Sequence, residues 1–225
     1  MEEEKFVKEA FENCMKRGWL KELIPSTITN QEIADLEEKY GVKLPAFYKA
    51  FLTSYQLPDD MYNICGIVDQ DGELTPYWLS LYGVSSIAKL EDNINFFRED
   101  ALEWREVTEE NCKMFIPIGD WGAGSGPLCI DLSKDEELID EEDESTWSLV
   151  WFDHEYFNWA EEYLGQDDLL HGRPAAPSLK ELLDWYFCGS HEAEFEEENE
   201  VKVNYERLSD MDFCCTFWED KWKEE

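Results

Sequence analysis

Hydrophobic residues follow a helical spacing in the first quarter of the chain. Apolar positions recur at intervals of three and four over residues 6–15, which predicts an N-terminal helix. Thr29 and Glu32 have the spacing of a capping box, which predicts that a second helix begins there and runs to Gly41. Pro45 then predicts a third helix with proline at its first position, where a missing amide hydrogen costs nothing.

After residue 60 the pattern changes to short apolar runs separated by turns. Residues 69–72, which read Asp-Gln-Asp-Gly, predict a hairpin turn. Strands are predicted over residues 115–118, 128–132 and 147–152, and a helix within residues 86–104. These elements indicate a sheet accompanied by helices.

Two helical patterns follow in the last quarter of the chain. Ser178 and Glu181 form another capping box, which predicts a helix that ends at Gly189. An acidic run covers residues 191–200, and apolar residues then recur in steps of three and four over residues 205–222. That spacing predicts an amphipathic C-terminal helix.

The charge of the chain is strongly one-sided. Fifty-four acidic residues oppose 19 basic ones, which gives a formal net charge of -35 over 225 residues. Such a field repels nucleic acid and anionic membranes, and it attracts basic proteins. The same acidity also keeps a protein with 15% aromatic residues soluble, so it does not by itself prove a basic partner.

The cysteines and the N-terminal segment predict a cytoplasmic protein. The seven cysteines are scattered and form no Cys-x-x-Cys pair, so neither a zinc site nor a redox motif is indicated. The first residues are acidic, whereas a secretory signal begins with basic residues and an apolar run. No apolar stretch is long enough to span a membrane.

The second and third predicted helices share one motif. It reads Ile33-x-x-Leu36-Glu37-x-x-Tyr40-Gly41-x-x-Leu44-Pro45-x-x-Tyr48-x-x-Phe51-Leu52. This motif resembles the opening of the SUKH superfamily, which includes yeast cell-wall-assembly (glucan synthesis) regulators and many bacterial immunity proteins. Residues 116–120 with 126–131, and residues 150–155, look like the strand core of the same superfamily.

The resemblance implies an α+β fold, with a curved, largely antiparallel sheet flanked by helices. It covers residues 28–189, so that residues 1–27 form an N-terminal helix and link, and residues 190–225 an acidic segment with a C-terminal helix. Residues 55–58, Tyr-Gln-Leu-Pro, stand where family members usually have an Asn-Gly-Gly-like turn. In this superfamily the domain binds other proteins and shares no known catalytic apparatus.

The glycine-rich residues 119–126 superficially resemble a phosphate-binding loop. Such a loop must open a helix, so that the backbone amides face the phosphate. Here Pro127 and an apolar strand follow, and no Gly-Lys-Ser/Thr is present. We therefore interpret this segment as a strand connection, and we expect no cofactor.

Residues 133–146 contain eight Asp or Glu residues among fourteen. Calcium needs several oxygen ligands around one point, and the spaced Asp-x-Asp-x-Asp-Gly pattern that provides them is absent. The segment is interpreted as a solvated loop, with a cation site and a contact with a basic partner as alternatives.

His154 lies between Asp153 and Glu155, which suggests acid–base chemistry. Alternation in a strand points neighbouring side chains to opposite sides, which predicts Asp153 and Glu155 on one face and His154 on the other. We therefore predict a structural or surface role for His154. With three histidines in all, and without a Gly-x-Ser-x-Gly or His-Glu-x-x-His motif, neither a catalytic residue nor a metal site is predicted.

A protein partner is the remaining prediction. Candidate contact residues are acidic positions in or beside predicted loops, together with a tryptophan in the glycine-rich turn: Asp120, Trp121, Glu141, Glu142, Asp143, Asp153 and Glu155. The leading hypothesis is an immunity protein that neutralises a basic, nuclease-type bacterial toxin. The alternative is a regulatory or scaffold protein that resembles the cell-wall-assembly regulators. The oligomeric state stays open.

Overall fold

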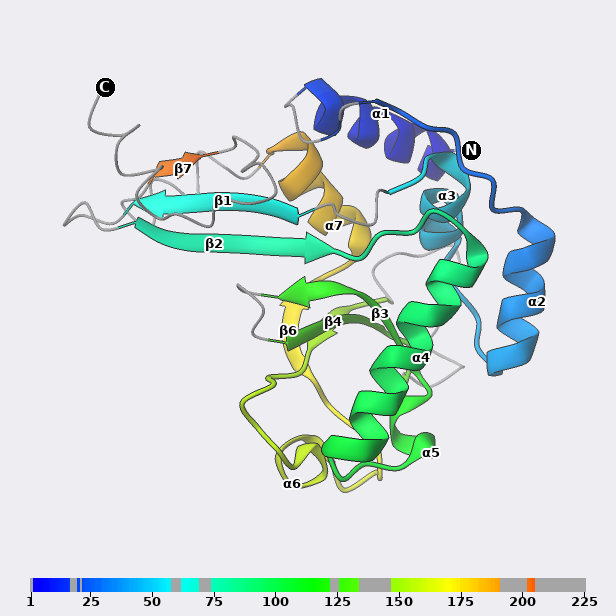
Figure 1. Cartoon of the computed structure of the whole chain (residues 1–225), viewed down its shortest axis with the longest axis vertical. Coiled ribbons are helices and arrows are strands. Elements are labelled where there is room, and N and C mark those ends of the chain that lie inside the picture. The colour runs from blue at the N-terminus through cyan, green and yellow to red at the C-terminus, as the bar shows by residue number, and fades with distance from the viewer. Residues whose placement is uncertain are drawn as a thin grey trace.

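The computed structural model describes residues 2–16, 20, 22–57, 62–68, 74–121, 126–133, 147–190 and 202–204 (Figure 1). Several predictions from the sequence lie outside these residues: the hairpin turn at 69–72, most of the glycine-rich turn, the acidic loop with Glu141, Glu142 and Asp143, and the C-terminal helix.

The sheet is open, and every strand pair in it is antiparallel. The strands are β1 (Tyr62–Val68), β2 (Leu74–Leu81), β3 (Phe115–Trp121), β4 (Gly126–Asp131), β5 (Leu149–Trp151), β6 (Arg173–Ala176) and β7 (Lys202–Asn204). Their order is β6-β5-β4-β3-β2-β1-β7. Strands β2 and β3 pair only at Ser80 with Asp120 and at Leu81 with Gly119, so the β1–β2 strand pair extends away from the part of the sheet formed by β3 to β6 (Figure 1).

Helices surround the β3–β6 part of the sheet (Figure 1). They are α1 (Glu2–Lys16), α2 (Asn30–Tyr40), α3 (Ala46–Ser54), α4 (Ile87–Trp104), α5 (Glu109–Cys112), α6 (Trp159–Tyr163) and α7 (Leu179–Leu183), which continues as the π-helical turn η2 (Asp184–Cys188). The predicted α+β fold, an antiparallel sheet with flanking helices, is thereby confirmed.

The helices of the motif have the predicted caps. The Thr29 hydroxyl accepts a hydrogen bond from the amide of Glu32 at 3.2 Å, and the Glu32 carboxylate accepts one from the amide of Thr29 at 2.8 Å. Gly41 ends α2 in the left-handed conformation with φ 66°, which glycine adopts at little cost. The prediction for Pro45 is wrong by one residue: its ψ of 145° is extended, so the helix begins at Ala46 and Pro45 is the N-cap.

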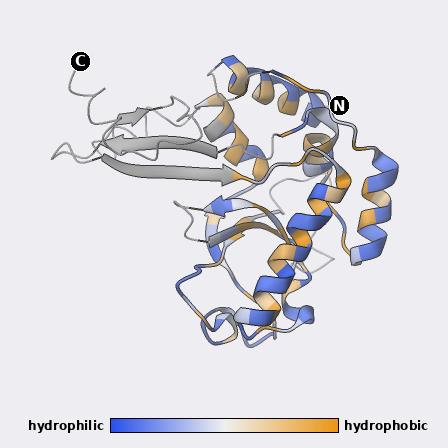
Figure 2. Cartoon of the chain, viewed as in Figure 1, coloured by the Kyte–Doolittle hydropathy of each residue, from blue (hydrophilic) through white to orange (hydrophobic). Residues whose placement is uncertain are grey.

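Two clusters of buried residues form the core. The larger cluster joins α1, α2, α3 and α7 to one face of the sheet. The smaller cluster is rich in aromatic residues and includes Phe97, Phe115, Phe152, Trp159 and Tyr163. Along α4, hydrophobic residues alternate with hydrophilic ones, so that one side of this helix packs inward while the other meets solvent (Figure 2).

Candidate functional site

The candidate site lies at the end of the sheet where β3 and β5 finish and β4 and β6 begin. Trp121 pairs with Gly126, and Trp151 pairs with both Leu128 and Arg173. Antiparallel register therefore brings residues from four strands to one end of the sheet. We call this region, consisting of Asp120, Trp121, Arg173 and residues 153–157, the sheet-end surface.

Gly126 allows the close approach that assembles this surface. A β-carbon at this position would lie 1.7 Å from the carbonyl oxygen of Phe152 and 3.2 Å from the amide nitrogen of His154. Residues 152–154 thus pass directly against the start of β4. A side chain at position 126 would push them away from Asp120 and Trp121.

The chain turns immediately after β5. The side chain of Asp153 accepts the amide of Glu155 at 3.0 Å, and the backbone carbonyl of Asp153 accepts the amide of Tyr156 at 3.3 Å. The predicted alternation of residues 153–155 is therefore wrong, because an aspartate that bonds the backbone two residues ahead favours a turn over a strand. His154 and Glu155 both project into solvent and contact each other at 3.1 Å.

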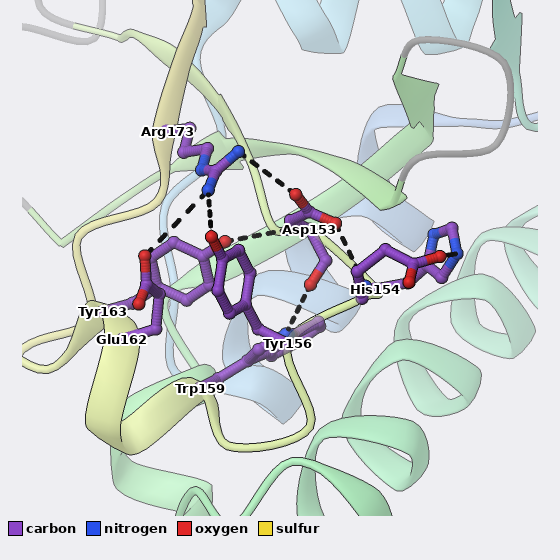
Figure 3. Close-up of polar contacts among 8 residues, drawn as sticks. Asp153, His154, Tyr156, Trp159, Glu162, Tyr163 and Arg173 are labelled. Carbon is purple, nitrogen blue, oxygen red and sulfur yellow. Dashed lines mark hydrogen bonds and ion pairs between the residues drawn. The ribbon is translucent and has the colours of Figure 1, made fainter.

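Arg173 holds this turn from β6 (Figure 3). Its Nη1 lies 3.1 Å from the Asp153 carboxylate, and its Nη2 donates to the Tyr156 hydroxyl at 3.1 Å. The guanidinium also lies 5.2 Å from the Trp151 ring centre and 5.1 Å from that of Tyr156. Planar stacking and paired hydrogen bonds suit a guanidinium better than an ammonium group. The Asp153 side chain is consequently only 16% exposed.

Aromatic residues of α6 support the turn from below. The Trp159 indole nitrogen donates to the Asp153 carbonyl at 3.1 Å, and the Tyr163 hydroxyl accepts the Asp153 amide at 3.1 Å. Trp159 also packs on Phe152, with ring centres 5.0 Å apart. Both polar groups of the Asp153 backbone and its carboxylate are thus engaged within the protein, which fixes the direction of Glu155 and its neighbours.

Asp120 and Trp121 end strand β3 on the neighbouring side of β4. The Tyr82 hydroxyl donates to the Asp120 carboxylate at 3.2 Å. Burial raises the pKa of this carboxyl group, while the Tyr82 hydrogen bond and the nearby His154 act in the opposite direction. Trp121 is half-buried and packs against the larger core cluster, so it presents only part of its ring to solvent.

Exposed aromatic residues adjoin the turn, and sequence reasoning did not select them. Phe157 is 80% exposed and Trp104, the last residue of α4, is 67% exposed. Arg105 connects the two segments, because its Nη1 donates to the carbonyls of His154 at 2.9 Å and Tyr156 at 3.3 Å. The aromatic run that begins at Tyr156 is visible in the sequence and was the signal that could have drawn attention here.

The site therefore combines carboxylates, a histidine and exposed aromatic rings on a turn held by many hydrogen bonds. Asp120, Trp121, Asp153 and Glu155 all belong to it, whereas Glu141, Glu142 and Asp143 lie outside the described residues. Within the part of the chain that the structure describes, no group of three or more His, Cys, Asp or Glu side chains could hold a metal ion. Among those residues, no helix is both long and apolar enough to cross a membrane.

Comparison with known families gives one result. Residues 27–185 match the model of the SMI1 / KNR4 family (SUKH-1), which is well over half of the 225-residue chain. The match contains α2, α3, the strands β1 to β6 and the whole sheet-end surface. No curated protein matches the chain.

Proposed function

The chain belongs to the SMI1 / KNR4 family (SUKH-1), and we propose that it is a non-catalytic protein-binding domain that neutralises a basic, nuclease-type bacterial toxin in the cytoplasm. The observation that carries this proposal is the sheet-end surface, where Asp120 and Glu155 lie beside exposed aromatic rings on a chain with a net charge of -35.

Electrostatics provides the selectivity in this proposal. A nuclease needs a basic surface to hold its substrate, because nucleic acid carries a dense negative charge. Carboxylates of the sheet-end surface would occupy that basic surface in place of phosphates. The charge of the whole chain would speed the encounter, since complementary charge raises association rates more than it raises affinity.

The candidate residues have distinct roles in the proposal. Glu155, whose side chain is 81% exposed, and Asp120 contact basic groups of the toxin. Trp121 and the exposed Phe157 supply apolar contact area, because buried aromatic residues contribute most to the affinity of protein interfaces. Asp153 acts as a positioning residue through its pairing with Arg173.

Three further carboxylates, those of Glu141, Glu142 and Asp143, are proposed to form a second acidic contact with the partner. They come from the loop that joins the end of β4 to the start of β5, and these two strand ends lie at the end of the sheet opposite the sheet-end surface. Their shared charge would act mainly on the rate of encounter with a basic partner.

A growth assay tests the proposal. Each gene that flanks the coding gene is induced in a bacterial host, with and without co-expression of this chain. We expect one flanking product to stop growth, and co-expression to restore growth through a stable complex seen by size-exclusion chromatography. If no flanking product is toxic, or if toxicity persists with the chain present, the immunity function is wrong and the regulatory or scaffold function takes its place.

A further inference from the structure

A groove lies between α4 and the adjoining ends of β2 and β3. Its volume is about 590 Å³, and it is lined by Tyr82, Lys89, Asp92, Asn93, Asn95, Phe96, Glu99 and Asp120. One wall is the solvent-facing side of α4, and the other consists of Tyr82 and Asp120. Asn93 fixes the two walls relative to each other, because its side-chain amide donates to the carbonyl of Gly83 at 3.3 Å.

The charge of the lining is negative. Three carboxylates, those of Asp92, Glu99 and Asp120, face one basic side chain, that of Lys89. Within the described residues, Asp92 and Glu99 form no ion pair, and the Asp120 carboxylate has the single hydrogen bond from Tyr82. A cation that enters the groove would therefore meet carboxylates on both walls and only one competing basic side chain, that of Lys89.

The groove also offers an aromatic contact. Phe96 is 70% exposed although it is a large hydrophobic residue, and it stands on the rim of the groove. A planar cation can stack on such a ring while it donates to carboxylates at its edge. An ammonium group carries the same charge but is not planar and cannot stack on a ring in this way. The combination of Phe96 with acidic neighbours therefore favours a guanidinium.

We propose that this groove receives an arginine side chain of the basic partner, with the guanidinium held among Asp92, Glu99 and Asp120 and the side-chain stem against Phe96. The proposal rests on the proposed function, because it names the group by which the basic partner would be recognised. It also joins the groove to the sheet-end surface, since Asp120 belongs to both.

An NMR titration of the full chain tests the groove without the toxin. The probe is an acetylated, amidated Gly-Arg-Gly tripeptide, and the matched control is the same peptide with citrulline, which keeps the shape of arginine and loses its charge. We expect amide resonances of residues 92–99 and 120 to shift with the arginine peptide alone. Shifts spread over the whole acidic surface, or equal shifts with citrulline, would overturn the assignment.

Variants sharpen the test. Asp120→Asn and Glu99→Gln each remove a charge-assisted hydrogen bond, so the dissociation constant should rise about threefold to tenfold for each. Phe96→Ala should also weaken binding. Because Phe96 is exposed, this variant should keep its fold, so it tests the groove independently of Asp120→Asn. Glu38→Gln removes a charge from the exposed side of α2 and should leave binding unchanged. Equal dissociation constants for all four variants would contradict the proposal.

The two proposals fail separately. If the arginine peptide binds in the groove but the chain rescues no flanking toxin, the immunity function is wrong and the groove assignment stands. If growth is rescued and the Asp120→Asn and Phe96→Ala variants bind the toxin as tightly as the unaltered chain, the groove assignment is wrong and the immunity function stands.

Discussion

Glu37 provides the most quantitative test of how the motif builds the fold. It is an acidic residue that is only 7% exposed. Its Oε1 accepts the amide of Leu44 at 2.7 Å and lies 2.9 Å from the ammonium group of Lys49. One carboxylate thus joins α2, the turn after Gly41 and α3.

The change to alanine removes an acceptor that Leu44, a fully buried residue, needs for its amide. A buried donor without a partner costs about 1–3 kcal/mol, and loss of the partly screened ion pair adds up to about 1 kcal/mol. We expect Glu37→Ala to lower the free energy of unfolding by about 3 kcal/mol, and Glu37→Gln, which retains an acceptor, by about 1 kcal/mol.

Urea unfolding followed by tryptophan fluorescence measures both changes. Glu38→Ala is the matched control, because it removes the same charge from the next, exposed position of α2. It should change the free energy of unfolding by less than about 0.5 kcal/mol. The reasoning is refuted if Glu37→Ala and Glu38→Ala have equal effects, or if Glu37→Gln costs as much as Glu37→Ala.

Three further predictions concern the sheet-end surface. Arg173→Lys should lower the free energy of unfolding by about 1–2 kcal/mol, because an ammonium group cannot bond Asp153 and stack between two rings at once, and urea unfolding would measure it. Asp120→Asn should stabilise the fold at neutral pH, because burial raises the pKa of this carboxyl group and so disfavours its charged form. The protonated Asp120 carboxyl destabilises the fold least, and this advantage is lost as pH rises through its raised pKa. The stability gained by Asp120→Asn should therefore shrink in acid. Urea unfolding at pH values on both sides of that pKa measures this, and a gain that is the same at both would contradict the reasoning. Gly126→Ala should lower the free energy of unfolding by about 3 kcal/mol or shift the amide resonances of residues 152–155, because the alanine β-carbon would clash with the Phe152 carbonyl. A variant with unchanged stability and unshifted resonances would contradict this.

The parts of the fold that are predictable from sequence are those fixed by local interactions. The capping box of Thr29 and Glu32 and the left-handed Gly41 involve residues close together in the chain, so their spacing alone identifies α2. Ser178 and Ser86 likewise cap α7 and α4 where the periodicity indicates helices. The motif also contains an acidic residue at a buried position, Glu37. Its contacts with Leu44 and Lys49 explain why an acid stands there.

The sheet-end surface depends on contacts that spacing does not reveal. Strand β6 reads Arg-Pro-Ala-Ala, which has little preference for strands, and it forms because β5 offers a free edge. Arg173 meets Asp153 across twenty residues of sequence. The alternation rule failed at Asp153 because its side chain bonds the backbone locally, a competition that periodicity ignores.

The most direct test of the account is the rate at which the chain associates with its toxin at different salt concentrations, measured by stopped-flow tryptophan fluorescence. If an anionic surface guides a basic protein onto the sheet end, the association rate constant should fall about tenfold or more between about 0.05 M and about 0.5 M salt, while the dissociation rate changes little. An association rate constant that stays the same over this range would contradict the account.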